Sequence, residues 1–249
     1  MKTLTPLSFA LSEIDRLRFG FVTAKATFTQ AEDARHAIQL SRSHVVSLLI
    51  ARVPTHCLAA AQELENRGSI LTDTLVQFVN KRITPEAVDL PAGYALRLAT
   101  KGDAPMIELV AAATFRDYLG HYHADPALDR KKCDQVYSSW AGLSCLDKTV
   151  ADAVLIIERE SEIAAFATLK FVDEVETEGV LFGVAPQHQS KGLYLCLMRA
   201  VQNLSLDATR RRMTVSTQVT NTAVQKAWCR LGYEPWRSVY TFHTWLKYD

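Results

Sequence analysis

Hydrophobic and polar positions in the first third of the chain repeat with the periods of strands and helices. Two-residue alternation or short apolar runs indicate strands, and a three-to-four-residue spacing indicates helices. Thr29 is placed to cap the first of these helices, and Gly68 follows the second. The pattern predicts a β-α-β-α-β order, with strands at 21–28, 45–53 and 75–79 and helices at 31–40 and 55–67.

The pattern in the remaining part predicts the order β-α-α-β-β-β-loop-α-β-α-β. Short polar turns between three successive strands favour an antiparallel meander. The predicted strands are 94–99, 153–158, 162–171, 179–184, 212–217 and 238–245, and the predicted helices are 104–113, 127–140, 193–204 and 222–231. Residues 115–126 are aromatic, rich in histidine and irregular, and 186–192 form a loop.

The clearest break in the pattern lies at residues 83–94, where two prolines and a glycine interrupt it. We therefore divide the chain into a smaller domain over 1–90 and a larger one over 91–249. Strands that alternate with helices, together with one meander, predict an α/β fold with a mixed sheet.

Composition excludes several classes of protein. The 249 residues carry a formal net charge of +1, with 48% hydrophobic and 22% charged residues, which is typical of a soluble globular protein. The low charge argues against bulk electrostatic binding of nucleic acid. No apolar run approaches the ~18 residues of a membrane span. The N-terminus is a poor signal peptide, and five scattered cysteines favour a reducing compartment, so we expect a cytoplasmic protein.

The segment with the clearest chemistry is the loop at 186–192. It joins a predicted strand to a helix, so its main-chain N–H groups and the positive end of the helix dipole predict an anion site. Gly192 allows a phosphate to approach the backbone closely, and Lys191 adds a positive charge.

The sequence Gln189-Ser-Lys-Gly192-Leu-Tyr194 resembles the acetyl-CoA pyrophosphate loop of the GNAT superfamily of N-acetyltransferases, Q/R-x-x-G-x-G/A. Tyr194 departs from that motif. Asn221 followed by Gly232-Tyr233 resembles the family's later strand–helix segment. The resemblance implies the GNAT fold and acetyl-CoA as cosubstrate. The residues it implies for the cofactor are Val184, Gln189, Ser190, Lys191, Gly192, Leu193, Tyr194, Asn221 and Trp228.

A looser resemblance, carried by residues 15–21 and 115–140, extends over nearly the whole chain to the TDP-fucosamine acetyltransferase family. It implies a smaller N-terminal half that is itself a partial GNAT-like unit. The activity it implies is N-acetylation of a TDP-linked amino-dideoxy sugar for surface polysaccharide (lipopolysaccharide O-antigen) synthesis, and the family often forms homodimers. Two alternatives remain open: a GNAT enzyme for another amine (an antibiotic, a polyamine or a peptide), or a degenerate acyl-CoA-binding regulator.

Acetyl transfer to an amine needs a polarised thioester carbonyl, a base for the amine and an acid for the thiolate. The resemblance places the main-chain N–H near Val184 at the carbonyl. Glu178 is the first candidate base, and His121, His123 and Asp125 are the second set. Trp228 stands where the family has the tyrosine that acts as acid, and an indole N–H cannot usefully give up its proton. Tyr194, Tyr118 or Tyr122 is a possible replacement.

The irregular loop is the candidate binding site for the acceptor. Aromatic rings stack on bases and arginine pairs with phosphate, so the cluster suits a nucleotide sugar. The candidate residues are Arg116, Tyr118, His121, Tyr122, His123 and Asp125. We expect no metal site, because the His-x-His pair has no evident third ligand.

Overall fold

A computed structural model describes residues 7–248 of the chain. The first third contains four strands and three helices, in the order β1 (Ser8–Leu11), α1 (Glu13–Phe19), β2 (Thr23–Thr27), α2 (Ala31–Ser43), β3 (Leu48–Pro54), α3 (Leu58–Asn66) and β4 (Ile70–Asn80). Gly20 ends α1 in the left-handed conformation, with φ of 86°. Such a backbone favours glycine because it has no Cβ.

The remaining part begins with β5 and ends with β10. Its elements are β5 (Tyr94–Leu98), a 3₁₀ turn (Lys101–Asp103), α4 (Ala104–Thr114), α5 (Arg130–Leu146), β6 (Ala153–Arg159), β7 (Glu162–Phe171), β8 (Glu176–Val184), a second 3₁₀ turn (Pro186–His188), α6 (Leu193–Asp207), β9 (Arg212–Gln218), α7 (Thr222–Arg230) and β10 (Glu234–Trp245). Asp129 caps α5 by accepting a hydrogen bond from the N–H of Lys132.

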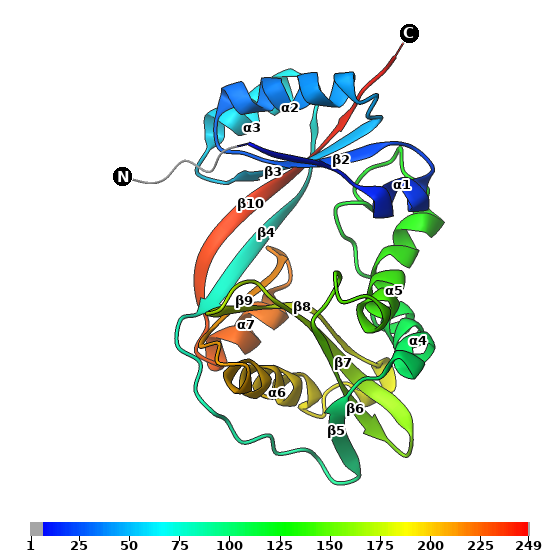
Figure 1. The fold of residues 1–249 in the computed structure, drawn as a ribbon, viewed down its shortest axis with the longest axis vertical. Coiled ribbons are helices and arrows are strands. Elements are labelled where there is room, and N and C mark those ends of the chain that lie inside the picture. The colour runs from blue at the N-terminus through cyan, green and yellow to red at the C-terminus, as the bar shows by residue number, and fades with distance from the viewer. Residues whose placement is uncertain (1–6, 249) are drawn as a thin grey trace.

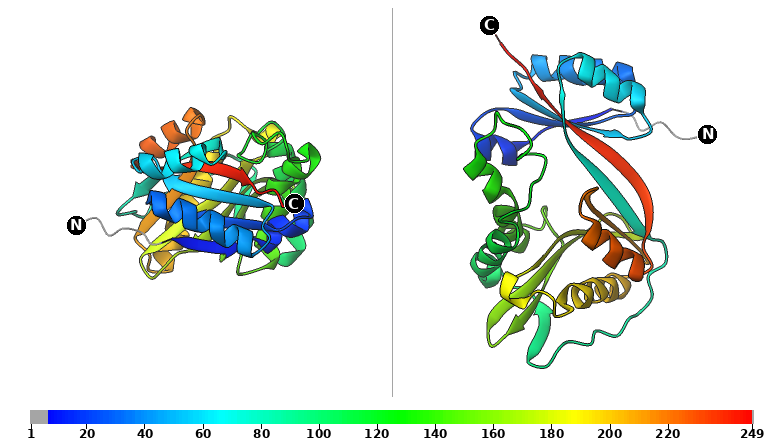
Figure 2. Two further views of the ribbon diagram at one scale, coloured as in Figure 1. Left: turned by 90° about the horizontal axis from the view of Figure 1, so that it is seen from above. Right: turned by 180° about the vertical axis from the view of Figure 1, so that it is seen from behind.

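All ten strands form one mixed sheet in the order β1-β2-β3-β10-β4-β9-β8-β7-β6-β5. The last strand of the chain lies between β3 and β4 and is antiparallel to both. Figure 1 shows β4 and β10 running side by side from the N-terminal half to the C-terminal half, and Figure 2 shows the same pair from behind. The two halves of the sequence therefore share one continuous sheet.

In the C-terminal part of the sheet, helices cover both faces, and in the N-terminal part α2 and α3 lie together on one face (Figure 1). Buried residues of α2 and α3 pack on β2, β3 and β10. Buried residues of α6 and α7 pack on one face of β4 to β9, and those of α4 and α5 pack on the other face of β6 to β8. A smaller apolar cluster, including Phe19, Ile50 and Tyr122, joins α1 and β3 to the loop before α5.

The predicted mixed α/β sheet and every predicted strand and helix have a counterpart in the structure. The cap of α2 is corrected: the capping residue is Gln30 rather than Thr29. The structure adds β1 and α1, which are too short to give a clear periodic pattern. Among the helices of residues 7–248, none combines the length and the apolar character of a membrane span.

The domain division at residue 90 stays a prediction. The sheet adds one fact to it: β10 belongs to the second part of the sequence, yet both of its neighbours, β3 and β4, belong to the first.

Candidate active site

Strands β8 and β9 separate at the centre of the C-terminal half. They run parallel and pair from Glu176↔Arg212 to Gly179↔Val215, and no further. Beyond Gly179, β8 continues to Val184 without β9, which stays paired with β4 from Met213 to Gln218. The main-chain groups of β8 that face this opening have no strand partner, and such groups need a hydrogen-bonding partner when they are shielded from water. The opening can therefore take an amide-bearing ligand.

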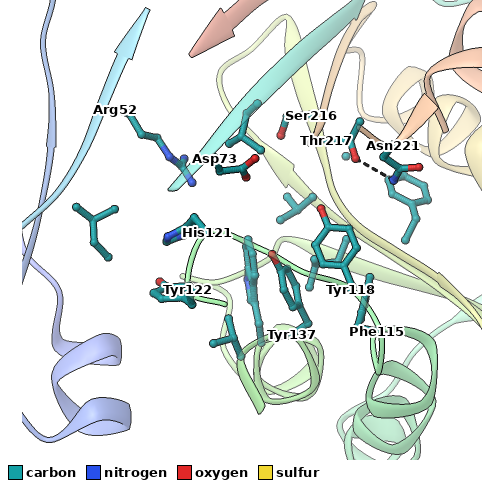
Figure 3. A pocket seen from close by; sticks show the side chains of 18 of the residues that line it. Arg52, Asp73, Phe115, Tyr118, His121, Tyr122, Tyr137, Ser216, Thr217 and Asn221 are labelled. Atoms are coloured by element: carbon teal, nitrogen blue, oxygen red, sulfur yellow. Dashed lines mark hydrogen bonds between the residues drawn. The ribbon is translucent and has the colours of Figure 1, made fainter. Parts of the chain in front are cut away.

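The opening leads into a cavity of about 570 Å³, a volume typical of small-molecule sites. At one end lie residues of β8, β9 and α7, and at the other lie residues of α1, β2, β3 and the irregular loop. Figure 3 shows Arg52, Asp73, His121 and Tyr118 gathered around the same space, with Thr217 and Asn221 at the far side. Both halves of the chain thus line one cavity.

The loop between β8 and α6 forms the turn that the anion site requires. Ser190 and Gly192 both have positive φ, of 62° and 79°. Within residues 7–248, the main-chain N–H groups of Ser190, Lys191 and Gly192 donate no hydrogen bond. They precede the 15-residue helix α6, whose N-terminus carries partial positive charge. Lys191 is exposed, and its Nζ donates to the hydroxyl of Tyr94 at 3.2 Å.

Tyr194 and Trp228, the two departures from the GNAT pattern, contact each other. The indole Nε1–H of Trp228 donates to the hydroxyl oxygen of Tyr194 at 2.8 Å. Trp228 is 2% exposed and packs on Phe78, and both partners line the cavity. Burial raises the pKa of Tyr194, and the bond from Trp228 opposes this by stabilising the phenolate. Because Trp228 occupies a lone pair of the oxygen, the tyrosine O–H proton is available to another acceptor.

Asn221 sits at the N-terminus of α7 at the same end of the cavity. Its side chain accepts a hydrogen bond from the N–H of Val224 and donates one to the hydroxyl of Thr217, at 3.0 Å. Of the other residues predicted for the cofactor, none from Val184 to Leu193 lines the cavity; they lie at its outer side, on the end of β8 and the turn before α6.

Of the six residues predicted in the irregular loop, three line the cavity and three do not. Tyr118, His121 and Tyr122 line the cavity. Asp125 is buried behind them, where it accepts from His243. His123 bonds Asp134 of α5 outside the cavity lining, and Arg116 is exposed and is also absent from the lining.

Glu178 is half-buried on β8, one residue before the cavity lining begins at Gly179. Burial raises its pKa, while the positive charge of Arg52 opposes the rise and the negative charge of Glu176 adds to it. A raised pKa suits a general base, so Glu178 stays a predicted base that would act through an intervening group.

Five charged residues of the first half line the cavity and were not predicted: Asp15 and Arg18 on α1, Lys25 on β2, Arg52 on β3 and Asp73 on β4. In β2 and β3 the residues on either side of them, such as Ala24 and Ala51, pack under the helices α2 and α3. Strand alternation therefore turns Lys25 and Arg52 to the opposite face. The segment 45–53 is so rich in Val, Ile and Leu that it was interpreted as a strand buried on both faces; Arg52 within it was the available signal of a polar face.

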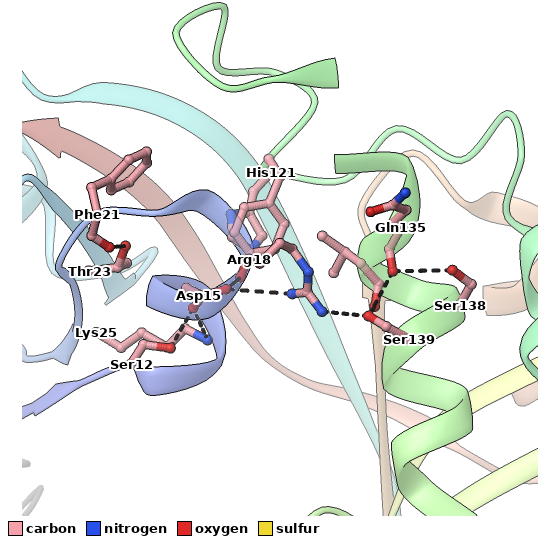
Figure 4. Close-up of polar contacts among 12 residues, drawn as sticks. Ser12, Asp15, Arg18, Phe21, Thr23, Lys25, His121, Gln135, Ser138 and Ser139 are labelled. Carbon is pink, nitrogen blue, oxygen red and sulfur yellow. Dashed lines mark hydrogen bonds and ion pairs between the residues drawn. The ribbon is translucent and has the colours of Figure 1, made fainter. Parts of the chain in front are cut away.

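A buried carboxylate fastens α1 to the irregular loop. Asp15 accepts hydrogen bonds from Ser12 and from the hydroxyl of Tyr122 at 2.8 Å, and it pairs with Lys25 at 2.7 Å. Figure 4 shows Asp15 with Ser12 and Lys25, and the bond from Arg18 to Ser139 of α5. Burial alone would raise the pKa of Asp15, but Lys25 and the two hydroxyl donors hold it below its usual range. This cluster joins α1, β2 and the irregular loop at one end of the cavity.

Comparison with protein families identifies the C-terminal part. Residues 113–233 match the family model of the Acetyltransferase (GNAT) family. This stretch, just under half of the chain, is similar to GNAT acetyltransferase domains. It contains the separated strands, the turn before α6 and the Tyr194–Trp228 pair, and it ends one residue before β10. No significant match was found among the curated proteins.

Solved structures share the fold over nearly the whole chain. A GCN5-related N-acetyltransferase from Sphaerobacter thermophilus has a TM-score of 0.67 at 10% identity, covering 98% of this chain and 78% of its own. One from Kribbella flavida has a TM-score of 0.64 at 14% identity, covering 97% and 87%. A tandem GNAT protein from the clavulanic acid biosynthesis pathway has a TM-score of 0.58 at 14% identity, covering 90% and 76%. The predicted GNAT fold with two GNAT-like halves is confirmed.

Proposed function

We propose that the protein is an acetyl-CoA-dependent N-acetyltransferase whose acceptor is a small amine bound between the two halves. The observation that carries the proposal is the separation of β8 from β9 beyond Gly179, directly beside the free N–H groups of the turn before α6. The turn suits the pyrophosphate of acetyl-CoA, and the unpaired edge of β8 suits the amides of its pantetheine arm.

Each residue at this end then has a role. The N–H groups of Ser190 to Gly192 and the charge of Lys191 bind the pyrophosphate, Asn221 contacts the pantetheine arm, and the main chain near Val184 polarises the thioester carbonyl. Tyr194 protonates the departing thiolate, and the N–H of Trp228 stabilises the resulting phenolate. Trp228 is thus a positioning residue, and Tyr194 takes the role of acid that the family gives to a tyrosine at the position of Trp228.

The acceptor end combines cations with aromatic rings. Arg52 points into the cavity and forms no ion pair or side-chain hydrogen bond with any of residues 7–248. Its guanidinium is therefore open to an anionic acceptor group. Tyr118 and Tyr137, whose ring centroids lie 5.0 Å apart, offer surfaces for stacking. These features support the finer proposal that the acceptor is a TDP-linked amino-dideoxy sugar.

The test is release of free CoA thiol from acetyl-CoA in the presence of candidate acceptors: TDP-linked amino-dideoxyhexoses, an aminoglycoside, spermidine and a short peptide. We expect turnover with the TDP-sugars and little with the other amines. Turnover with another amine alone overturns the sugar assignment but keeps the reaction. Calorimetry with acetyl-CoA, run in parallel, separates the remaining outcomes: binding without turnover favours a regulatory acyl-CoA-binding protein, and absence of binding overturns the proposal.

The homodimer, the cytoplasmic location and the polysaccharide pathway belong to the same proposal. Size-exclusion chromatography with light scattering tests the first. The edge strands of the described sheet are β1 and β5, and each is short. Short edges limit further strand pairing, so a dimer would be expected to use side-chain contacts as well.

A further inference from the structure

Three buried side chains form a hydrogen-bonded line that ends at the cavity. Asp125 Oδ2 lies 2.6 Å from His243 Nδ1, and His243 Nε2 lies 2.8 Å from His121 Nδ1. The three residues are 3%, 0% and 8% exposed, in that order, and His121 lines the cavity. Asp125 and His121 come from the irregular loop, whereas His243 comes from β10, so this line connects elements far apart in the sequence.

The partners of Asp125 determine where the ring protons lie. The carboxylate also accepts from the Nε1–H of Trp245 at 2.9 Å and from the main-chain N–H of Ala127 at 3.0 Å. Burial alone would raise the pKa of Asp125, but the hydrogen bond from His243 and these two further donors hold it below its usual range. An ionised carboxylate can only accept, so His243 donates from Nδ1 and, when neutral, presents a lone pair at Nε2.

The tautomer of His243 in turn determines the tautomer of His121. Since His243 Nε2 accepts, neutral His121 donates from Nδ1, and the lone pair of His121 is then on Nε2. This nitrogen has no hydrogen-bond partner within residues 7–248 and is not among the fully buried atoms there that lack one, and its ring lines the cavity. The ring therefore offers a proton acceptor to the cavity, in the tautomer set by the two residues behind it.

We propose that His121 is the general base for the acceptor amine, and that His243 and Asp125 are positioning residues that fix its tautomer and balance its charge. This inference rests on the proposed acetyl transfer. The acceptor ammonium gives one proton to His121 Nε2, which leaves a neutral amine for attack and an imidazolium at His121. The Nδ1 proton of that imidazolium can shift to His243 Nε2, so that the positive charge lies beside the carboxylate of Asp125.

The charges around His121 favour its neutral form before the reaction. Burial lowers its pKa well below the ordinary value, and His243 on β10, Arg52 on β3, Lys25 on β2 and His123 on the loop lower it further. Tyr122, beside it, stays protonated, because burial raises its pKa. A neutral imidazole is thus present at neutral pH, and a proton passed on to His243 would lie beside the carboxylate of Asp125.

The decisive experiment compares variants across pH with the acceptor that the wild-type protein acetylates fastest in the panel above. His121→Asn keeps a donor for His243 and removes the base. We expect its kcat to fall by about 10²–10³-fold at pH 7, with the KM for acetyl-CoA unchanged. His243→Gln offers an acceptor to His121 but loses the link to Asp125, and we expect a loss of about 10–100-fold. His36→Gln, on the exposed side of α2, is the matched control and should match the wild type.

The pH profile separates catalysis from a structural role. Above the pKa of the acceptor amine the solvent removes the proton, so the kcat of His121→Asn should come within about tenfold of the wild-type kcat. A deficit that is equal at every pH, or that follows a loss of thermal stability, contradicts the proposal. A wild-type rate retained in His121→Asn also contradicts it.

A second measurement needs no acceptor. Nitrogen-15 NMR of labelled histidine should show both His121 and His243 protonated at Nδ1 in the wild-type protein, and His243→Gln should release His121 to a mixture of tautomers. A wild-type His121 protonated at Nε2 overturns the inference even if acetyl transfer is found. Absence of turnover by the wild type with every amine overturns the proposed function instead, so the two failures are distinguishable.

Discussion

The hydrogen bond between Trp228 and Tyr194 gives a prediction whose size follows from the structure. Tyr194→Phe leaves the buried indole N–H without its acceptor, which costs about 1–3 kcal/mol of unfolding free energy. Trp228→Phe removes the donor and some packing, at a cost of about 1–3 kcal/mol. The double variant leaves no unpaired group. Its cost should therefore fall below the sum of the two single costs by about 1–2 kcal/mol.

The catalytic consequences of the two changes differ. If Tyr194 is the acid, Tyr194→Phe lowers kcat by about 10²-fold or more while calorimetry finds unchanged affinity for CoA. Trp228→Phe keeps the acid but removes a hydrogen bond to the phenolate, worth about 1.5–3 kcal/mol, so kcat falls about ten- to a hundredfold. Trp228→Ala adds a cavity and costs about 3–5 kcal/mol, or about 6–20 °C in melting temperature.

Urea unfolding of the four proteins of the cycle, combined with CoA-release kinetics, checks both parts. Strictly additive unfolding free energies would show that the two side chains do not interact in solution. A Tyr194→Phe variant with wild-type kcat would refute its role as acid and leave the thiolate to depart unassisted.

Three further outcomes follow from single side chains. Arg52→Gln should raise the KM for a TDP-amino sugar about tenfold or more and leave that for acetyl-CoA unchanged, as steady-state kinetics can measure. Gly192→Ala should cost about 1–2 kcal/mol, because φ is 79° although no atom lies within 4 Å of the added Cβ; calorimetry should also show weaker CoA binding. Asp15→Asn should cost about 2 kcal/mol at pH 7. The folded-state pKa of Asp15 is lowered, so its contribution to stability is present above about pH 4 and is lost as the pH falls further. The difference in melting temperature between wild type and variant should therefore be smaller at pH 3 than at pH 7.

Most of the fold could be predicted because its elements are local. Each long strand or helix carries its own period, and the polar turn at 186–192 shows the strand–helix junction directly. The position of β10 could not be read in this way. Its pairing with β3 and β4 depends on contacts nearly two hundred residues apart in the sequence, such as Val239 with Pro54, and no periodic pattern reports such a partner.

The residues of the candidate site also fall into two groups, those that the sequence could predict and those that it could not. Gly192, Asn221, Tyr118 and His121 lie in loops or at helix ends, where their polarity contrasts with the apolar pattern around them. Arg52, Asp73 and His243 lie within strands, where a polar residue can face solvent, a cavity or a buried partner. Only the packing of α2 and α3 on one face of the sheet shows that Arg52 faces the cavity, and only the folded loop shows that His243 lies behind His121.

The shared sheet predicts that the proposed reaction needs the first half of the chain. Residues 91–249 alone would leave β10 without either of its strand neighbours, since both lie within residues 1–90. The loss of β10 would remove His243 from behind His121, and the loss of α1 would remove Asp15 from Tyr122. Because Lys25, Arg52 and Asp73 line the cavity from the first half, substitutions there could change the acceptor that is bound without changing the proposed acetyl-CoA site. In the proposed reaction the N-terminal half would form one wall of the acceptor site, and its β3 and β4 hold β10, the strand that carries His243.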